Sequence, residues 1–209
     1  MTTQTAANSN DFNITISDRG LGYNRPQRMG RKLWAPMWVM AMMAFPVAFI
    51  VGLVRSNLIS DGGSEASISS LLHTQVGIMF IGFAAVFAAI SFAIARILGE
   101  FRKGGGEVQE TVGKLVATLK MPASARVFVL GMAMAMMTVF IASVVHLVWA
   151  AQVSSGAVSV AEAEEAFVAL EAVRRIGVAV YLVSITFGLA TIIKVLRFQA
   201  IRVRELVST

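Results

Sequence analysis

Residues 71–95 read LLHTQVGIMFIGFAAVFAAISFAIA, a run without any Asp, Glu, Lys or Arg. A helix of about 20 apolar residues crosses the ~30 Å hydrocarbon core of a bilayer. Three further runs of this kind cover residues 33–54, 127–151 and 176–193. We therefore predict an all-α integral membrane protein, an antiparallel bundle of four transmembrane helices.

The overall composition favours the same class of protein. Charged residues make up 14% of the chain and hydrophobic residues 56%, whereas soluble domains carry about 25% charged residues. Cysteine is absent, which excludes disulfides, thiolate metal sites and a cysteine nucleophile. The first apolar run begins after 32 mostly polar residues and is too long for a secretory signal, so we expect it to remain as the first membrane helix.

Lysine and arginine residues are distributed unevenly along the chain. Five precede the first apolar run, six lie between the second and third, and four follow the fourth; the other two connections hold only Arg55, Arg174 and Arg175. Basic residues concentrate in cytoplasmic segments. We therefore expect a bacterial-type inner membrane protein with both termini in the cytoplasm and with anionic lipids at that face. This topology accounts for the net charge of +6, so we expect no nucleic-acid partner.

The chain divides into a tail, residues 1–32, and a membrane domain, residues 33–209. The first 18 residues lack apolar periodicity and are expected to form a cytoplasmic tail that is flexible or ordered by a partner. The rest of the tail is basic. It is either a solvated segment that touches lipid headgroups or an arm laid on another subunit.

Two features are predicted in the polar parts of the membrane domain. Glycines 104–106 are expected to form a linker that leads into an amphipathic helix over about residues 107–120, on the membrane or on a partner. Ser159 and Glu162 match a capping box. The fourth helix is therefore expected to begin before its apolar span and to extend beyond both ends of that span.

The chain contains two histidines, His73 and His146. His73 precedes the basic residue Arg96 by 23 positions, and His146 follows Arg126 by 20. At 1.5 Å per residue these separations are about 34 and 30 Å. The two rings are therefore expected at a similar level near the outer face, where they can face each other.

The histidines belong to a polar rim with two interpretations. His73 and His146 are candidate ligands of haem b and candidate partners of a quinone, with Arg174 beside a quinone carbonyl or a haem propionate. Copper is a weaker candidate, although the clustered methionines offer soft ligands. The same side chains also fit a purely structural role, in which they reach the interface and pair with one another. The other residues of this rim are Arg55, Gln75 and Glu171.

The absence of charge within the spans narrows the function. Proton relays, ion-coupled carriers and voltage sensors normally use ionisable groups inside the membrane, and the sequence has no phosphate-binding loop or nucleophile elbow. Small residues recur along the second run and permit close helix contact. We expect a non-catalytic accessory or structural subunit of a larger inner-membrane complex, packed through small-residue faces and the basic arm. The alternative is an electron-transfer subunit that binds haem b or quinone through His73 and His146.

Overall fold

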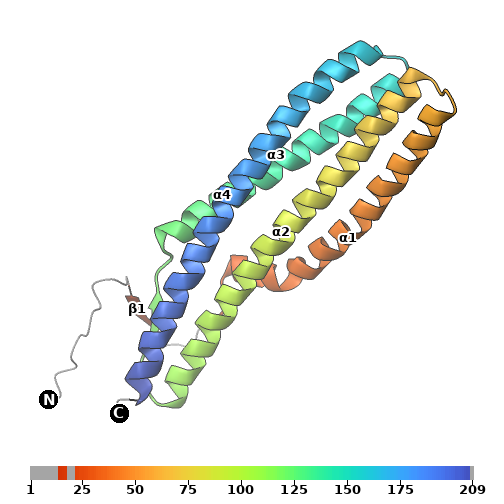
Figure 1. The fold of residues 1–209 in the computed structure, drawn as a ribbon. Helices are drawn as coiled ribbons and strands as arrows, with labels where there is room; N and C mark the ends of the chain where they lie inside the picture. Colours follow the sequence, from red (N-terminus) through yellow and green to blue (C-terminus); the bar gives the residue numbers. More distant parts are fainter. Residues whose placement is uncertain (1–13, 18–21, 208–209) are drawn as a thin grey trace.

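Four long helices form the protein in the computed structural model, which describes residues 14–17 and 22–207. They are α1 (Arg25–Ser60), α2 (Glu65–Thr111), α3 (Ala123–Ser154) and α4 (Val160–Val207), and they lie lengthwise side by side (Figure 1). Each helix is long and apolar enough to cross a membrane. The predicted four-helix fold is confirmed, and the helices indicate a membrane protein.

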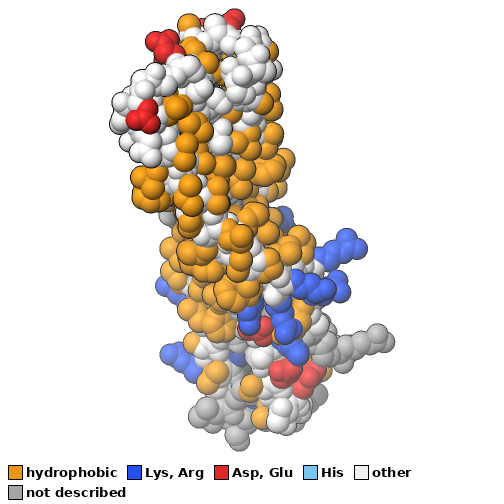
Figure 2. All heavy atoms as spheres, turned by 90° about the vertical axis from the view of Figure 1, so that its right-hand side faces the viewer, with side chains coloured by type: hydrophobic (Ala, Val, Ile, Leu, Met, Phe, Trp, Pro, Cys, Tyr) orange, Lys and Arg blue, Asp and Glu red, His pale blue; other side chains and the backbone are white. Residues whose placement is uncertain are grey.

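The surface is banded along the bundle (Figure 2). Hydrophobic side chains cover the middle. Lys and Arg gather below this band together with some Asp and Glu, whereas the opposite tip shows Asp and Glu without Lys or Arg. We call the end with the starts of α1 and α3 and the ends of α2 and α4 the basic end. The end with the α1–α2 and α3–α4 connections is the acidic end. The excess of basic residues that the sequence predicts at one end of the bundle is therefore present on the folded surface.

The helices pack through small residues. α1 lies on the outside against α2, while α2, α3 and α4 contact one another. A Cβ atom added to Gly82 of α2 would lie 3.2 Å from Ala44 Cβ of α1, and one added to Gly177 of α4 would lie 2.8 Å from Val139 Cγ2 of α3. Small-residue faces predicted to contact a partner are thus used between helices of this chain.

The core lies where α2, α3 and α4 meet. The rings of Phe87 and Tyr181 stack there with centroids 3.5 Å apart. Both belong to a cluster of buried apolar side chains from the three helices. α1 stays outside this cluster, and only 17% of its most apolar window is buried, compared with 39% for α2.

The connection at the basic end differs from the prediction. α2 continues through glycines 104–106 to Thr111, so these glycines are not a linker and residues 107–120 do not form a separate helix. Instead β2 (Val116–Leu119) pairs antiparallel with β1 (Ile14–Ser17). The prediction was wrong because four residues do not distinguish a helical from a strand period, and because the partner strand lies about a hundred residues away.

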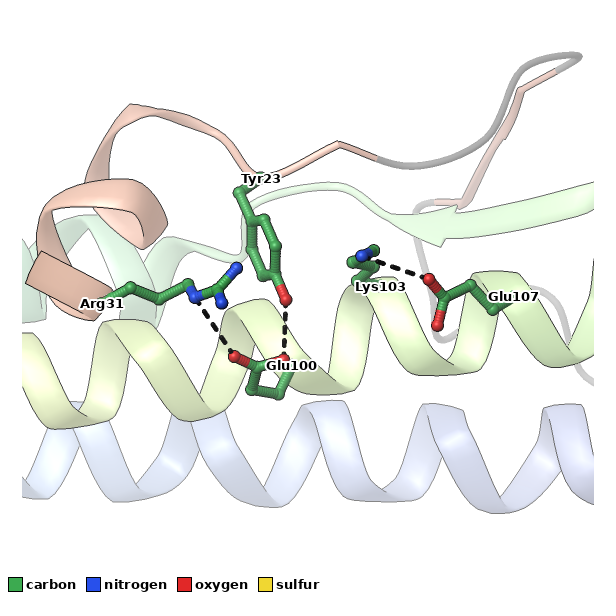
Figure 3. A network of polar contacts seen from close by, with 5 residues as sticks. All are labelled: Tyr23, Arg31, Glu100, Lys103 and Glu107. Atoms are coloured by element: carbon green, nitrogen blue, oxygen red, sulfur yellow. Dashed lines mark hydrogen bonds and ion pairs between the residues drawn. The ribbon is translucent and has the colours of Figure 1, made fainter.

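The described part of the basic arm lies on its own α2. α1 begins at Arg25 with a reciprocal capping box between Asn24 and Gln27, so residues 25–32 of the predicted tail are helical. The Tyr23 hydroxyl donates a hydrogen bond of 2.7 Å to Glu100 of α2, and Arg31 Nε lies 3.7 Å from the same carboxylate (Figure 3). The bond to Glu100 raises the pKa of Tyr23.

The prediction of a flexible or partner-ordered tail concerns residues 1–18. Of these, residues 14–17 form β1, which is ordered by pairing with β2 of the same chain. Residues 1–13 and 18–21 lie outside the described residues.

The predicted capping box starts α4. The Ser159 N–H donates to Glu162 Oε2 at 2.8 Å, and the Glu162 N–H donates to Ser159 Oγ at 3.3 Å. The hydrogen bonds that the N–H and the hydroxyl of Ser159 donate to the Glu162 carboxylate lower the pKa of this carboxyl. The extension of α4 beyond both ends of its apolar span is confirmed, because the helix runs from Val160 to Val207.

Glu162→Ala is expected to loosen the first turn of α4 near neutral pH and to have no effect in acid. Because folding lowers the pKa of this carboxyl, its contribution is present above the unfolded value of 4.5 and is lost as the pH falls through the folded value. Hydrogen exchange of the first-turn amides, compared between wild type and variant at each pH, measures the effect. Glu165→Ala is the matched control. A difference that stays constant into acid would contradict the prediction.

Candidate functional site

His73 of α2 and His146 of α3 contact each other inside the bundle. Their Nδ1 atoms are 2.9 Å apart and both residues are 0% exposed. The close approach of the helices makes this contact possible. A Cβ atom on Gly77, one turn from His73, would lie 3.1 Å from the Ser143 carbonyl oxygen. On the other side of the pair, Ser70 Oγ donates 2.9 Å to the Ala150 carbonyl.

The hydrogen bonds determine the tautomers of the two neutral rings. His73 Nε2 lies 3.1 Å from the Ala163 carbonyl of α4, which can only accept, so this nitrogen carries the hydrogen. His73 Nδ1 is then an acceptor, and His146 Nδ1 must donate to it. This bond takes up the single ring N–H of neutral His146. His146 Nε2 is therefore left as a buried acceptor without a hydrogen-bond partner.

Arg174 of α4 provides a buried cation in the same region. Its guanidinium carbon lies 4.4 Å from the centroid of the Phe80 ring and 5.4 Å from that of Phe167. The residue is 4% exposed, and its Nε and Nη1 atoms are buried without hydrogen-bond partners. The neighbouring carboxylate of Glu171 pairs with Arg175. No ion pair between described residues therefore neutralises Arg174.

Phe167 joins the histidine pair to Arg174. Its ring makes edge contacts with both imidazoles, with centroids 5.5 Å from His73 and 5.4 Å from His146. A cavity of about 270 Å³ lies beside the site, and His73 and Phe167 line its wall. The remaining lining residues are Ser69, Leu72, Glu164 and Val168.

Three of the predicted rim residues lie close together in the structure. His73 and His146 face each other as expected, and Arg174 lies beside Phe167, which both rings contact. Gln75 does not join them, because its amide packs against Gly52 of α1. Among the described residues, no hydrogen bond, ion pair or ring contact links Arg55 of α1 to the pair, and Glu171 pairs with Arg175.

Ala163 and Phe167 were missed as parts of the site. Both lie on one helical stripe with Arg174, at spacings of four and seven residues. The helix was predicted to begin near Ser159. The i, i+4 and i+11 spacing of Ala163, Phe167 and Arg174 therefore indicated that these three residues share one face. Neither residue has a polar side chain, so neither was a candidate ligand.

The geometry does not fit a haem held by both histidines. The iron and its planar macrocycle would have to lie between the imidazoles, whereas the rings contact each other directly and His73 Nε2 is bonded to Ala163. The methionines proposed for copper point in different directions: Met132 of α3 is 2% exposed, while Met134 and Met137 are 64% and 57% exposed. What the site offers chemically is two donor atoms of Arg174 and one acceptor atom of His146.

Searches of protein-family models, of curated proteins and of solved structures each give no match to this chain.

Proposed function

We propose that this protein is a non-catalytic accessory subunit of a larger inner-membrane complex, with the basic end in the cytoplasm. The excess of Lys and Arg at that end supports the orientation. Inside the bundle, the helices pack through small residues and through a core of buried apolar side chains. Such a bundle serves to hold position and shape in an assembly.

The observation that carries the proposal is a two-helix stalk at the basic end. We define the stalk as α2 from Ile97 to Thr111 together with α4 from Val195 to Arg204. Figure 1 shows α2 and α4 continuing side by side well past the start of α3. Two helices that extend beyond the apolar band have no role in crossing the membrane, so they are available for a protein partner.

Polar contacts hold the stalk together. Gln199 Nε2 donates 3.0 Å to the Phe101 carbonyl, and Arg202 donates to Gln109, with Arg202 and Gln109 both buried. Gln109 Oε1 also accepts from the Ala117 N–H of β2 at 3.0 Å. The stalk and the two-stranded sheet therefore form one ordered polar unit, as a docking element requires.

A substitution in the stalk tests the proposal. A Cβ atom at Gly105 would run into the ends of Arg202 and Gln199, whereas one at Gly104 would have nothing within 4 Å. Gly105→Ala should displace the Arg202 side chain from Gln109, while Gly104→Ala should keep the stalk intact. Partner chains are counted by quantitative mass spectrometry after purification of the tagged protein from native membranes in mild detergent.

We expect Gly105→Ala to lower the yield of partner chains about tenfold, equivalent to a loss of about 1.4 kcal/mol in binding. Gly104→Ala should retain them, and both variants should keep the wild-type content of helix. If wild-type protein brings no other chain, or if the two variants bring partners equally well, the stalk is not the docking element.

Quinone binding is a second candidate function, favoured by the unpartnered atoms at the site. A quinone carbonyl accepts hydrogen bonds of the kind Arg174 can donate, and a quinol hydroxyl donates to an acceptor such as His146 Nε2. A mostly apolar cavity lies next to the histidine pair, and its wall includes His73 and Phe167 but not Arg174 or His146. Quinone recovered in stoichiometric amount from the purified chain would favour electron transfer over the accessory role.

A further inference from the structure

A shallow, open apolar groove lies along α1 where this helix adjoins α2, near the basic end. It has a volume of about 670 Å³ and is bounded by α1 and by Ile78 of α2. All its lining side chains are apolar, and on α1 they are Ala35, Pro36, Val39, Met40, Met43, Ala44 and Val47. We call this feature the α1 groove.

Two basic residues continue the stripe of the groove toward the basic end. Arg28, Lys32, Pro36, Val39 and Met43 follow one another at intervals of three or four residues, which places them on one face of the helix. Both basic side chains are exposed. No ion pair between described residues engages either of them, since Arg31 is the residue of this turn that pairs with Glu100.

The length of the groove matches one leaflet of a bilayer. From Ala35 to Val47 the helix rises about 18 Å at 1.5 Å per residue. One leaflet contributes about 15 Å of hydrocarbon. The two basic residues lie within the next two turns below the groove, at the level expected for headgroups.

We propose that the α1 groove, together with Arg28 and Lys32, binds one anionic phospholipid from the leaflet at the basic end. The phosphate lies against the two cations, and an acyl chain follows the groove past Val39 and Met43. Methionine suits such a wall because its unbranched side chain adapts to a mobile hydrocarbon chain. The groove ends at Val47, and beyond it the exposed apolar side chains of α1 continue to Val54.

Binding is measured on the delipidated full-length protein in detergent by native mass spectrometry. The probes are dioleoyl phosphatidylglycerol, dioleoyl phosphatidylcholine and inorganic phosphate, which separate an anionic lipid from any lipid and from any phosphate. Wild-type protein should retain one phosphatidylglycerol and should bind it at least about tenfold more tightly than phosphatidylcholine. Inorganic phosphate should not compete with it at millimolar concentration.

Two pairs of variants test the two halves of the site. Arg28→Gln with Lys32→Gln should weaken phosphatidylglycerol about 30-fold, or about 1 kcal/mol for each basic residue. Arg197→Gln with Arg204→Gln removes the same charge from exposed positions of α4 and should leave affinity nearly unchanged. Val39→Trp fills the groove and should weaken both lipids, while Val54→Trp, equally exposed on α1 but outside the groove, should not.

Three results would overturn the proposal. Equal affinity for the two lipids would mean that the headgroup charge is not recognised. Equal losses of phosphatidylglycerol affinity in the two charge variants would mean that the lipid is attracted by the overall charge of the protein and not by Arg28 and Lys32. A photoreactive amino acid at Met43 that crosslinks to a polypeptide in native membranes, and not to lipid, would show that a partner helix occupies the groove.

Discussion

His73→Leu is expected to lower the free energy of unfolding by about 1–3 kcal/mol. The substitution puts an apolar side chain of similar size in place of the ring but removes the acceptor of the His146 Nδ1–H, which is then left buried without a partner. A buried polar group that loses its hydrogen bond is destabilising by this amount. Unfolding of the purified protein by SDS in mixed micelles, followed by circular dichroism, provides the measurement.

The double variant His73→Leu with His146→Leu separates pairing from packing. When both partners of a buried hydrogen bond become apolar, no group is left unsatisfied, so the double variant should be more stable than the two single losses predict. A coupling of about 1 kcal/mol or more is expected, whereas independent sites add within about 0.5 kcal/mol. Additive losses would mean that the two rings do not interact in the folded protein.

Gly30→Ala is expected to destabilise the protein by about 1–3 kcal/mol relative to Gly104→Ala. A Cβ atom on Gly30 would lie 2.6 Å from the Phe92 carbonyl oxygen and 2.9 Å from the Arg96 nitrogen. These are backbone atoms of α2 and cannot rotate away, so α1 must move outward. Overpacking of this kind is destabilising by that range.

Gly104→Ala is the matched control, because it lies within helix α2 and its Cβ would meet nothing within 4 Å. Both variants gain the same helix propensity, up to about 1 kcal/mol. The difference between them in SDS unfolding therefore reports the contact of α1 with α2. Equal stability of the two variants would mean that α1 does not pack closely on α2 at this level.

Much of the fold was predictable because the apolar runs are long and uncharged. The four helices are confirmed, but the positions of the charged residues indicated only the limits of the apolar spans and not the ends of the helices. α1 therefore begins at Arg25, eight residues before its predicted span, and its start is decided by the capping box of Asn24 and Gln27. The long α4 was predicted correctly because Ser159 and Glu162 carry a local signal and because no Gly or Pro follows Gly188.

The errors arose where distant contacts override local pattern. Glycines 104–106 resemble a linker, yet they remain helical because Gly105 permits the close approach of Arg202 on α4. The strand β2 depends on β1, which lies about a hundred residues earlier. Neither contact has a signature in the segment itself.

The level of the two histidines along the bundle was predictable, but their hydrogen bonds and ring contacts were not. A constant rise per residue placed His73 and His146 at one level, and the structure brings their rings into contact. The hydrogen bond to Ala163 and the contacts of Phe167 come from α4, whose rotation about its axis could not be derived from the sequence. These contacts determine which nitrogen remains unpartnered.

Extraction from native membranes in a mild detergent tests the central claim most directly. The peak that contains this chain is analysed for mass, for its other polypeptides and for visible absorbance. An accessory subunit predicts a colourless assembly, or one whose pigment belongs to other chains, much larger than the 22.4 kDa chain and its detergent. A small peak of this chain alone would contradict the account, and haem or quinone bound to that chain would assign it to electron transfer.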